Sequence, residues 1–222
     1  MDIDEIIVLL KEKSNPKYLA GMKRFGIRDE FALGIPLPEL RKISKSIKTD
    51  QALSMTRWKT NFHEAKLLAS MIGDAAKVTP KQMDEWVNDF NSWDLCDQVC
   101  GNLFDKTPYA VEKAFEYSQG PHEFTKRAGF VLMAEYAVHN KKAGDEVFVS
   151  FLPVIQREAC DPRNFVRKAV NWSLRQIGKR NGCLRDKAIQ TASVLLEMDC
   201  KTARWIASEA LRELKRKSDR NQ

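Results

Sequence analysis

The chain has 222 residues, of which 43% are hydrophobic, and its 37 Lys and Arg outnumber 30 Asp and Glu, for a formal net charge of +7. This length suffices to bury a sizeable core, and the positive surplus favours a polyanionic partner. The acidic start, Met-Asp-Ile-Asp-Glu, differs from a secretion signal, and no apolar run reaches the roughly 18 residues that cross a membrane. We therefore expect a soluble cytoplasmic protein with no membrane partner.

Metal, cofactor and disulfide chemistry find little support in the sequence. The five cysteines are an odd number without a CxxC pair, so they predict reduced thiols rather than a disulfide framework or a zinc site. They are Cys96, Cys100, Cys160, Cys183 and Cys200. The three histidines lack metal-ligand spacing, and no Walker loop, GxGxxG or GxSxG motif is present. We expect neither a metal nor a cofactor.

Proline-containing turn signals divide the chain into segments with helical periodicity, and segments of alternating β-branched residues are missing. The sequence therefore predicts an all-α fold. The predicted helices are 2–13, 16–25, 36–47, 50–58, 61–75, 80–90, 92–105, 108–118, 121–139, 145–159, 162–180, 184–197 and 200–217.

From residue 50 onward the predicted helices form antiparallel pairs, whose second helices begin every 30 to 40 residues or so, which is typical of helical repeats. We expect an α-solenoid of HEAT-like helix pairs whose inner helices line a concave, basic groove. The expected organisation is one domain, 1–222, with N-terminal helices in 1–48, helix-pair repeats in 49–217 and a frayed tail in 218–222. A monomer is the default state for such an array.

The predicted helix 92–105 carries an aromatic and a carboxylate on one face. Trp93 and Asp97 are i,i+4 neighbours that lie away from the middle of the apolar stripe. One interpretation is structural: Asp94 and Asp97 favour the positive end of the helix dipole, and Trp93 packs on the preceding helix. The other is that Trp93 and Asp97 face a ligand.

Arg127 lies near the start of the predicted helix 121–139, which is apolar around most of its circumference and is therefore central. Spacing allows an ion pair with Glu123 at i−4. It also allows the guanidinium to reach a phosphate from a rigid element. The sequence leaves both interpretations open.

The predicted helix 162–180 has two incompatible faces. At about 100° per residue, a small or apolar stripe runs along one side, made of Val166, Ala169, Val170, Ser173, Leu174 and Ile177. Lys168, Arg175 and Lys179 line the opposite side, and Trp172 falls among them. An indole among cations favours nucleic acid as the ligand. Trp205 repeats this placement, although we expect it to pack on a neighbouring segment.

Five motifs give the chain a resemblance to a known family. They are Met22-Lys-Arg-Phe25, Leu33-Gly-Ile-Pro-Leu-Pro-Glu-Leu-Arg41, Ser92-Trp-Asp-Leu-Cys-Asp97, Lys126-Arg-Ala128 and Phe165-Val-Arg-Lys-Ala-Val-Asn-Trp-Ser-Leu-Arg175. Over nearly its whole length the chain resembles the DNA alkylation repair family. The resemblance implies a glycosylase that hydrolyses the N-glycosidic bond of 3-methyladenine and 7-methylguanine in duplex DNA. Such an enzyme would associate with the nucleoid when bound to DNA.

The resemblance also assigns roles to residues. It places catalysis on Trp93, Asp97, Arg127 and Trp172, phosphate contacts on Lys168, Arg175 and Lys179, and a further DNA contact on Phe25. Phe25 departs from the pattern, because the best-known member has a tyrosine there; losing the hydroxyl removes a hydrogen bond to phosphate or sugar. Two alternatives remain. Some relatives lack the catalytic set and bind damaged or branched DNA without excising bases, and many HEAT-like arrays are protein–protein scaffolds.

Overall fold

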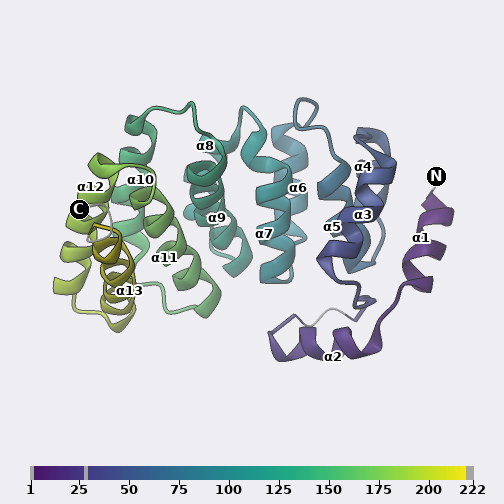
Figure 1. The fold of residues 1–222 in the computed structure, drawn as a ribbon, viewed down its shortest axis with the longest axis horizontal. Helices are drawn as coiled ribbons and strands as arrows, with labels where there is room; N and C mark the ends of the chain where they lie inside the picture. Colours follow the sequence, from purple (N-terminus) through teal and green to yellow (C-terminus); the bar gives the residue numbers. More distant parts are fainter. Residues whose placement is uncertain (1–2, 28–29, 219–222) are drawn as a thin grey trace. The chain divides into compact units, whose positions relative to one another are not determined.

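The computed structural model describes residues 3–27 and 30–218, and every regular element in that part of the chain is a helix (Figure 1). The prediction of an all-α chain is therefore confirmed. The contacts divide the chain into two compact units, Met1–Thr107 and Pro108–Gln222, each with its own packing.

The first unit contains α1 (Ile3–Glu12), α2 (Pro16–Arg24), α3 (Leu37–Ile47), α4 (Gln51–Trp58), α5 (His63–Ile72), α6 (Pro80–Asn88), α7 (Trp93–Asn102) and the short 3-10 helix η1 (Phe104–Lys106). Helix α5 is its centre, because it contacts α1, α3, α4 and α7 and buries most of its side chains. Two tryptophans join α4 to α6: Trp58 stacks on Trp86 with ring centroids 3.9 Å apart.

A buried carboxylate fixes the turn at residues 33–35, just before α3. Glu64 of α5 is fully buried, and it accepts hydrogen bonds from the backbone N–H groups of Leu33, Gly34 and Ile35 at 2.7 to 3.1 Å. Gly34 has a φ of 76°, and a Cβ there would lie 2.4 Å from the carbonyl oxygen of Asn15, just before α2. This position therefore requires glycine. Glu64 thus holds the turn that carries α2.

The second unit contains α8 (Ala110–Ser118), α9 (Glu123–His139), α10 (Asp145–Glu158), α11 (Asn164–Gly178), α12 (Gly182–Glu197) and α13 (Lys201–Ser218). Its helices form two layers (Figure 1): α8, α10 and α12 contact one another in sequence, and α9, α11 and α13 do the same in the other layer. Each helix of the first layer also packs on the next helix of the chain. This is the alternation of helix pairs expected from the sequence.

Helices α8 and α9 approach each other closely at Gly129. A Cβ there would lie 2.3 Å from the backbone nitrogen of Ser118 and 2.8 Å from the carbonyl oxygen of Ala114. Backbone atoms cannot move aside as a flexible side chain can. The absence of a side chain at Gly129 therefore sets the spacing of this helix pair.

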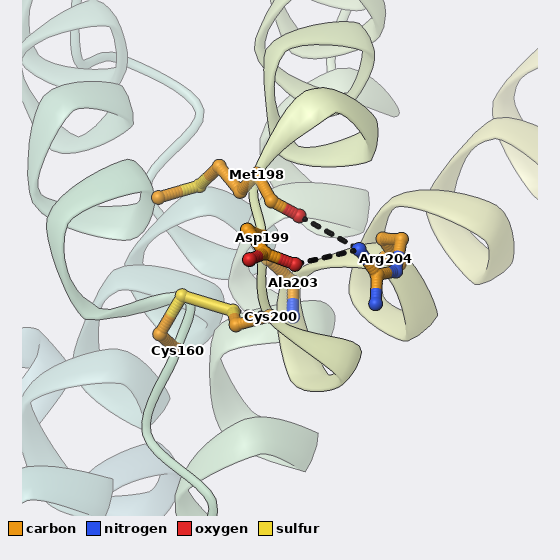
Figure 2. Close-up of a disulfide and its surroundings, with 6 residues drawn as sticks. All are labelled: Cys160, Met198, Asp199, Cys200, Ala203 and Arg204. Atoms are coloured by element: carbon orange, nitrogen blue, oxygen red, sulfur yellow. Dashed lines mark hydrogen bonds and ion pairs between the residues drawn. A yellow bond between two sulfur atoms is a disulfide. The ribbon is translucent and has the colours of Figure 1, made fainter.

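The cysteines correct one prediction. Cys160, after α10, forms a disulfide with Cys200, just before α13, whereas the sequence predicted reduced thiols (Figure 2). The prediction was wrong because the partners are 40 residues apart, so no local motif announces them. Cys96 and Cys100 are buried free thiols, and Cys183 is exposed. The bond ties the loop that enters α11 to the loop that enters α13.

Helix boundaries agree with the prediction to within a few residues. Helix α11 begins at Asn164, with Arg163 at its N-cap, so Asp161 lies before the helix. Asp161 instead accepts a hydrogen bond from the backbone of Arg163 at 3.0 Å and pairs with the Arg163 guanidinium. At the other end α13 continues to Ser218, and the rest of the predicted frayed tail, 219–222, lies outside the described residues. None of the described helices is both long and apolar enough to cross a membrane.

Candidate functional site

Trp93 opens α7 and is held from two sides. Ser92 takes the N-cap position, although its hydroxyl makes no capping hydrogen bond. The Trp93 indole N–H donates to the carbonyl oxygen of Phe25 at 3.0 Å, and the ring packs against the small cluster formed by Met22, Ile27 and Ala32. Trp93 thus packs on the α2 segment, whereas the structural interpretation of the sequence had it packing on the preceding helix. Trp93 is consequently fixed in position, with part of its surface exposed.

Asp97 lies one turn after Trp93 on α7 and is half-buried. Its neighbours Cys96 and Cys100 are fully buried, as the predicted apolar stripe requires. A half-buried carboxylate on a rigid helix can accept hydrogen bonds or stabilise positive charge at a defined place. Trp93 and Asp97 thus lie one turn apart on α7, and both keep part of their surface exposed.

The structure contains a buried histidine–aspartate pair, between α5 and the first turn of α7, that the sequence did not predict. His63 of α5 is fully buried, and its Nε2 lies 2.8 Å from Oδ2 of Asp94. Burial raises the pKa of Asp94, but the hydrogen bond and charge of His63, together with hydrogen bonds from Ser92 and the Leu95 backbone, outweigh this, so the pKa of Asp94 lies below its ordinary value. The 31 residues between the partners hide this pair from any local pattern. It anchors α7 to α5.

A pocket of 620 Å³ opens beside Trp93. Apolar side chains from α2, α5 and the following loops form most of its wall, and Trp93 and Asp94 close one side. The lining residues are Asn15, Lys17, Tyr18, Gly21, Met22, Phe25, Ile27, Ile35, Leu37, Leu67, Trp93 and Asp94. The Phe25 ring borders it while remaining 73% exposed, so this aromatic is available to a ligand.

Arg127 in the second unit is buried and holds the start of α11. Its Nη1 donates to the carbonyl oxygen of Phe165 at 2.5 Å. Glu123, one turn earlier on α9, accepts from the backbone N–H of Phe165 at 3.3 Å. Arg127 and Glu123 thus bind the backbone carbonyl and the backbone N–H of the same residue of α11, Phe165.

Helix α11 has the two faces that its sequence predicts. All six residues of the predicted apolar stripe are buried, whereas Lys168 is exposed and Trp172 is half-buried. The cationic face differs from the expectation in one respect. Glu213 of α13 forms ion pairs with both Arg175 and Lys179, so two of the three predicted phosphate contacts are already occupied by a carboxylate.

Trp205 of α13 is half-buried and carries a cation on its face. The guanidinium carbon of Arg167 lies 4.7 Å from the ring centroid, which is within the range of a cation–π contact. Trp205 therefore does pack on the neighbouring helix, through an arginine of α11.

In the described part of the chain, no group of three or more His, Cys, Asp or Glu side chains is arranged to hold a metal ion.

The chain was compared with protein-family models, with solved structures and with curated proteins. A family model described as DNA alkylation repair enzyme matches residues 6–214. One similar solved structure is described as a new family of proteins related to the HEAT-like repeat DNA glycosylases with affinity for branched DNA structures. It has a TM-score of 0.80 and 19% sequence identity, and the match covers 97% of this chain and 95% of that one. No curated protein gave a significant sequence match. The HEAT-like fold is thereby confirmed.

Proposed function

Because the chain belongs to the DNA alkylation repair enzyme family, we propose that it hydrolyses the N-glycosidic bond of alkylated purines in duplex DNA. The proposed substrates are purines that carry the alkyl group on a ring nitrogen, such as 3-methyladenine and 7-methylguanine. The observation that carries the proposal is on α7, where the half-buried carboxylate of Asp97 follows one turn after a tryptophan held by α2.

The chemistry of the leaving group explains why so few residues suffice. Alkylation of a ring nitrogen makes the purine cationic, so the base departs as a neutral molecule and needs little or no general acid. The sugar left behind develops positive charge, as in other glycoside hydrolyses. Asp97 would stabilise that charge and orient or deprotonate the attacking water. The same carboxylate serves both needs.

The tryptophans would bind the cationic nucleoside. An indole face attracts a cation, and the contact is worth about 2 kcal/mol or more once water is excluded. Trp93 is suited to this role because its N–H is already bonded to Phe25, which fixes the orientation of the ring. We assign Trp172 the same task and Arg127 a phosphate, following the family pattern. Lys168 would contact the DNA backbone without reading sequence.

A direct test is to incubate methylated duplex DNA with the protein and identify the released bases by chromatography. We expect release of 3-methyladenine or 7-methylguanine by the unmodified chain and a loss of at least about a hundredfold in rate for Asp97→Asn, the scale of removing one group that stabilises transition-state charge. Asp186→Asn is the matched control, because Asp186 is an exposed aspartate of α12 and belongs to no proposed site. Binding without release would leave this chain a DNA-binding protein and contradict the proposal.

A further inference from the structure

Glu213 of α13 bridges two cations of α11. Its Oε2 lies 2.5 Å from Nη1 of Arg175, and its Oε1 pairs with Nζ of Lys179, one turn further along α11. The side chains remain 31%, 21% and 32% exposed for Arg175, Lys179 and Glu213, so solvent and ligands reach the cluster. We call these three residues the Glu213 cluster.

The Glu213 cluster is charged at neutral pH. Burial raises the pKa of Glu213, but hydrogen bonds from Lys179 and Arg175 and their two charges outweigh this, so its pKa lies below the ordinary value. One carboxylate against two cations leaves the cluster with a single positive charge instead of two. Arg175 Nε is also buried with no hydrogen-bond partner among the described residues. Its Nη1 donates to the carboxylate.

Packing between α11 and α13 does not depend on these ion pairs. Leu174 and Ile177 of α11 are fully buried, as are Ile206 and Leu214 of α13. Asn171 donates to the carbonyl oxygen of Ile206 at 2.9 Å, which adds a buried hydrogen bond across the two helices. Half-exposed ion pairs contribute about 0 to 1 kcal/mol to stability. The ion pairs of Glu213 therefore contribute little to the stability of the fold.

A carboxylate that binds an Arg and a Lys at i,i+4 stands where a phosphate oxygen would bind, because both anions accept the same charge-assisted hydrogen bonds. We propose that Arg175 and Lys179 form a phosphate site for the DNA backbone and that Glu213 occupies this site in the free protein, acting as an internal competitor of DNA. This inference rests on the proposed function only for its partner, DNA. Lys168 is exposed and forms no ion pair with any described residue, so it can contact a phosphate whether or not Glu213 occupies the site.

The competitor would weaken binding to undamaged DNA. A phosphate must displace the carboxylate before it gains Arg175 and Lys179, so contacts elsewhere have to support the exchange. Weaker non-specific binding lets a repair protein leave undamaged sites sooner, since phosphate contacts dominate that affinity. Glu213 is thus inferred to set how much of the affinity is independent of the lesion.

The test compares Glu213→Gln, which removes the charge, with Glu213→Asp, which keeps it. Glu197→Gln is the control for net charge, because Glu197 is an exposed residue that ends α12. Affinity for an undamaged duplex is measured by fluorescence anisotropy between about 50 and 200 mM salt, and thermal unfolding of each variant checks that it folds. We expect Glu213→Gln to bind severalfold tighter at the lower salt. One additional phosphate contact steepens the salt dependence by about 0.9, so this advantage should shrink about 3.5-fold at the higher salt.

Glu213→Asp should bind like the unmodified chain. Equal or weaker binding by Glu213→Gln, or an equal gain in Glu197→Gln, would overturn the inference, as would a failure of every variant to bind DNA. Base release from methylated DNA, measured on the same preparations, separates the two proposals. Tighter binding by Glu213→Gln without release by any protein would support the phosphate site and contradict the glycosylase. Release without tighter binding would do the reverse.

Discussion

His63 and Asp94 show how a single buried pair can support a functional helix. The 2.8 Å contact joins α5 to the first turn of α7, directly beside Trp93. Asp94 lies within the motif that suggested catalysis, yet its carboxylate is bonded to a histidine that is fully buried. The contact with α5 therefore fixes the position of the first turn of α7, which carries Trp93 and is followed by Asp97.

This pair predicts a pH-dependent stability difference. Because the pKa of Asp94 is lowered by folding, its contribution to stability is complete above the unfolded-state pKa and is lost as the pH falls through the folded-state pKa. Asp94→Asn should lower the free energy of unfolding by about 1 to 3 kcal/mol near pH 7, since a buried imidazole loses its partner. The deficit should begin to shrink below about pH 4, where the carboxyl titrates in the unfolded chain, and should vanish as the pH falls through the lower folded-state pKa of Asp94. Urea unfolding at several pH values measures it.

Asp186→Asn, at an exposed position, is the control and should change little at any pH. A deficit for Asp94→Asn that stayed constant or grew toward acid would contradict the assigned role of the pair.

At the scale of elements, local patterns predicted the helices and missed what joins them. Prolines and 3.6-residue periodicity located α2, α6 and α11 to within a few residues, because both signals act within one helix. The pairing of Glu213 with Arg175 spans 38 residues, and nothing in the sequence around either residue indicates the other. The apolar stripe of α11 was predicted correctly. The ion pairs that Arg175 and Lys179 form with Glu213 were not predicted.

The α8–α9 contact gives a prediction about a glycine. Gly129→Ala places a Cβ against the backbone of Ser118 and Ala114, so the helices must separate. We expect a loss of about 1 to 3 kcal/mol in the free energy of unfolding, the range for overpacked sites. Gly21→Ala is the contrast, because nothing lies within 4 Å of a Cβ there, in the middle of α2. It should stabilise by about 0.4 to 1 kcal/mol; equal effects of the two substitutions would refute this account.

The disulfide gives a second prediction at this scale. Cys160 and Cys200 close a loop of 40 residues that contains α11 and α12. Cross-linking a loop of this length restricts the unfolded chain, so Cys160→Ser should lower the free energy of unfolding by about 2 to 4 kcal/mol under oxidising conditions. Reductant should destabilise the unmodified chain and leave Cys160→Ser unchanged. Cys183→Ser, at an exposed free thiol, is the control. Insensitivity of the unmodified chain to reductant would show that the bond does not form.

For the whole molecule, the family match connects the chain to DNA alkylation repair. The family model spans 6–214, and the catalytic residues that the resemblance assigns come from both units: Trp93 and Asp97 from the first, Arg127 and Trp172 from the second. These four residues were proposed from sequence motifs alone. The motifs did not indicate that Arg127 would be buried against Phe165, because that contact depends on how α9 and α11 pack.

The central claim is that this chain removes alkylated purines and that Asp97 is essential for the reaction. The most direct measurement is the identity and rate of bases released from methylated duplex DNA by the unmodified chain and by Asp97→Asn, with enzyme in excess so that product release does not limit the rate. We predict free 3-methyladenine or 7-methylguanine from the unmodified chain and almost none from Asp97→Asn, although that variant still binds the DNA. No released base from the unmodified chain, or equal release from both proteins, would contradict the account.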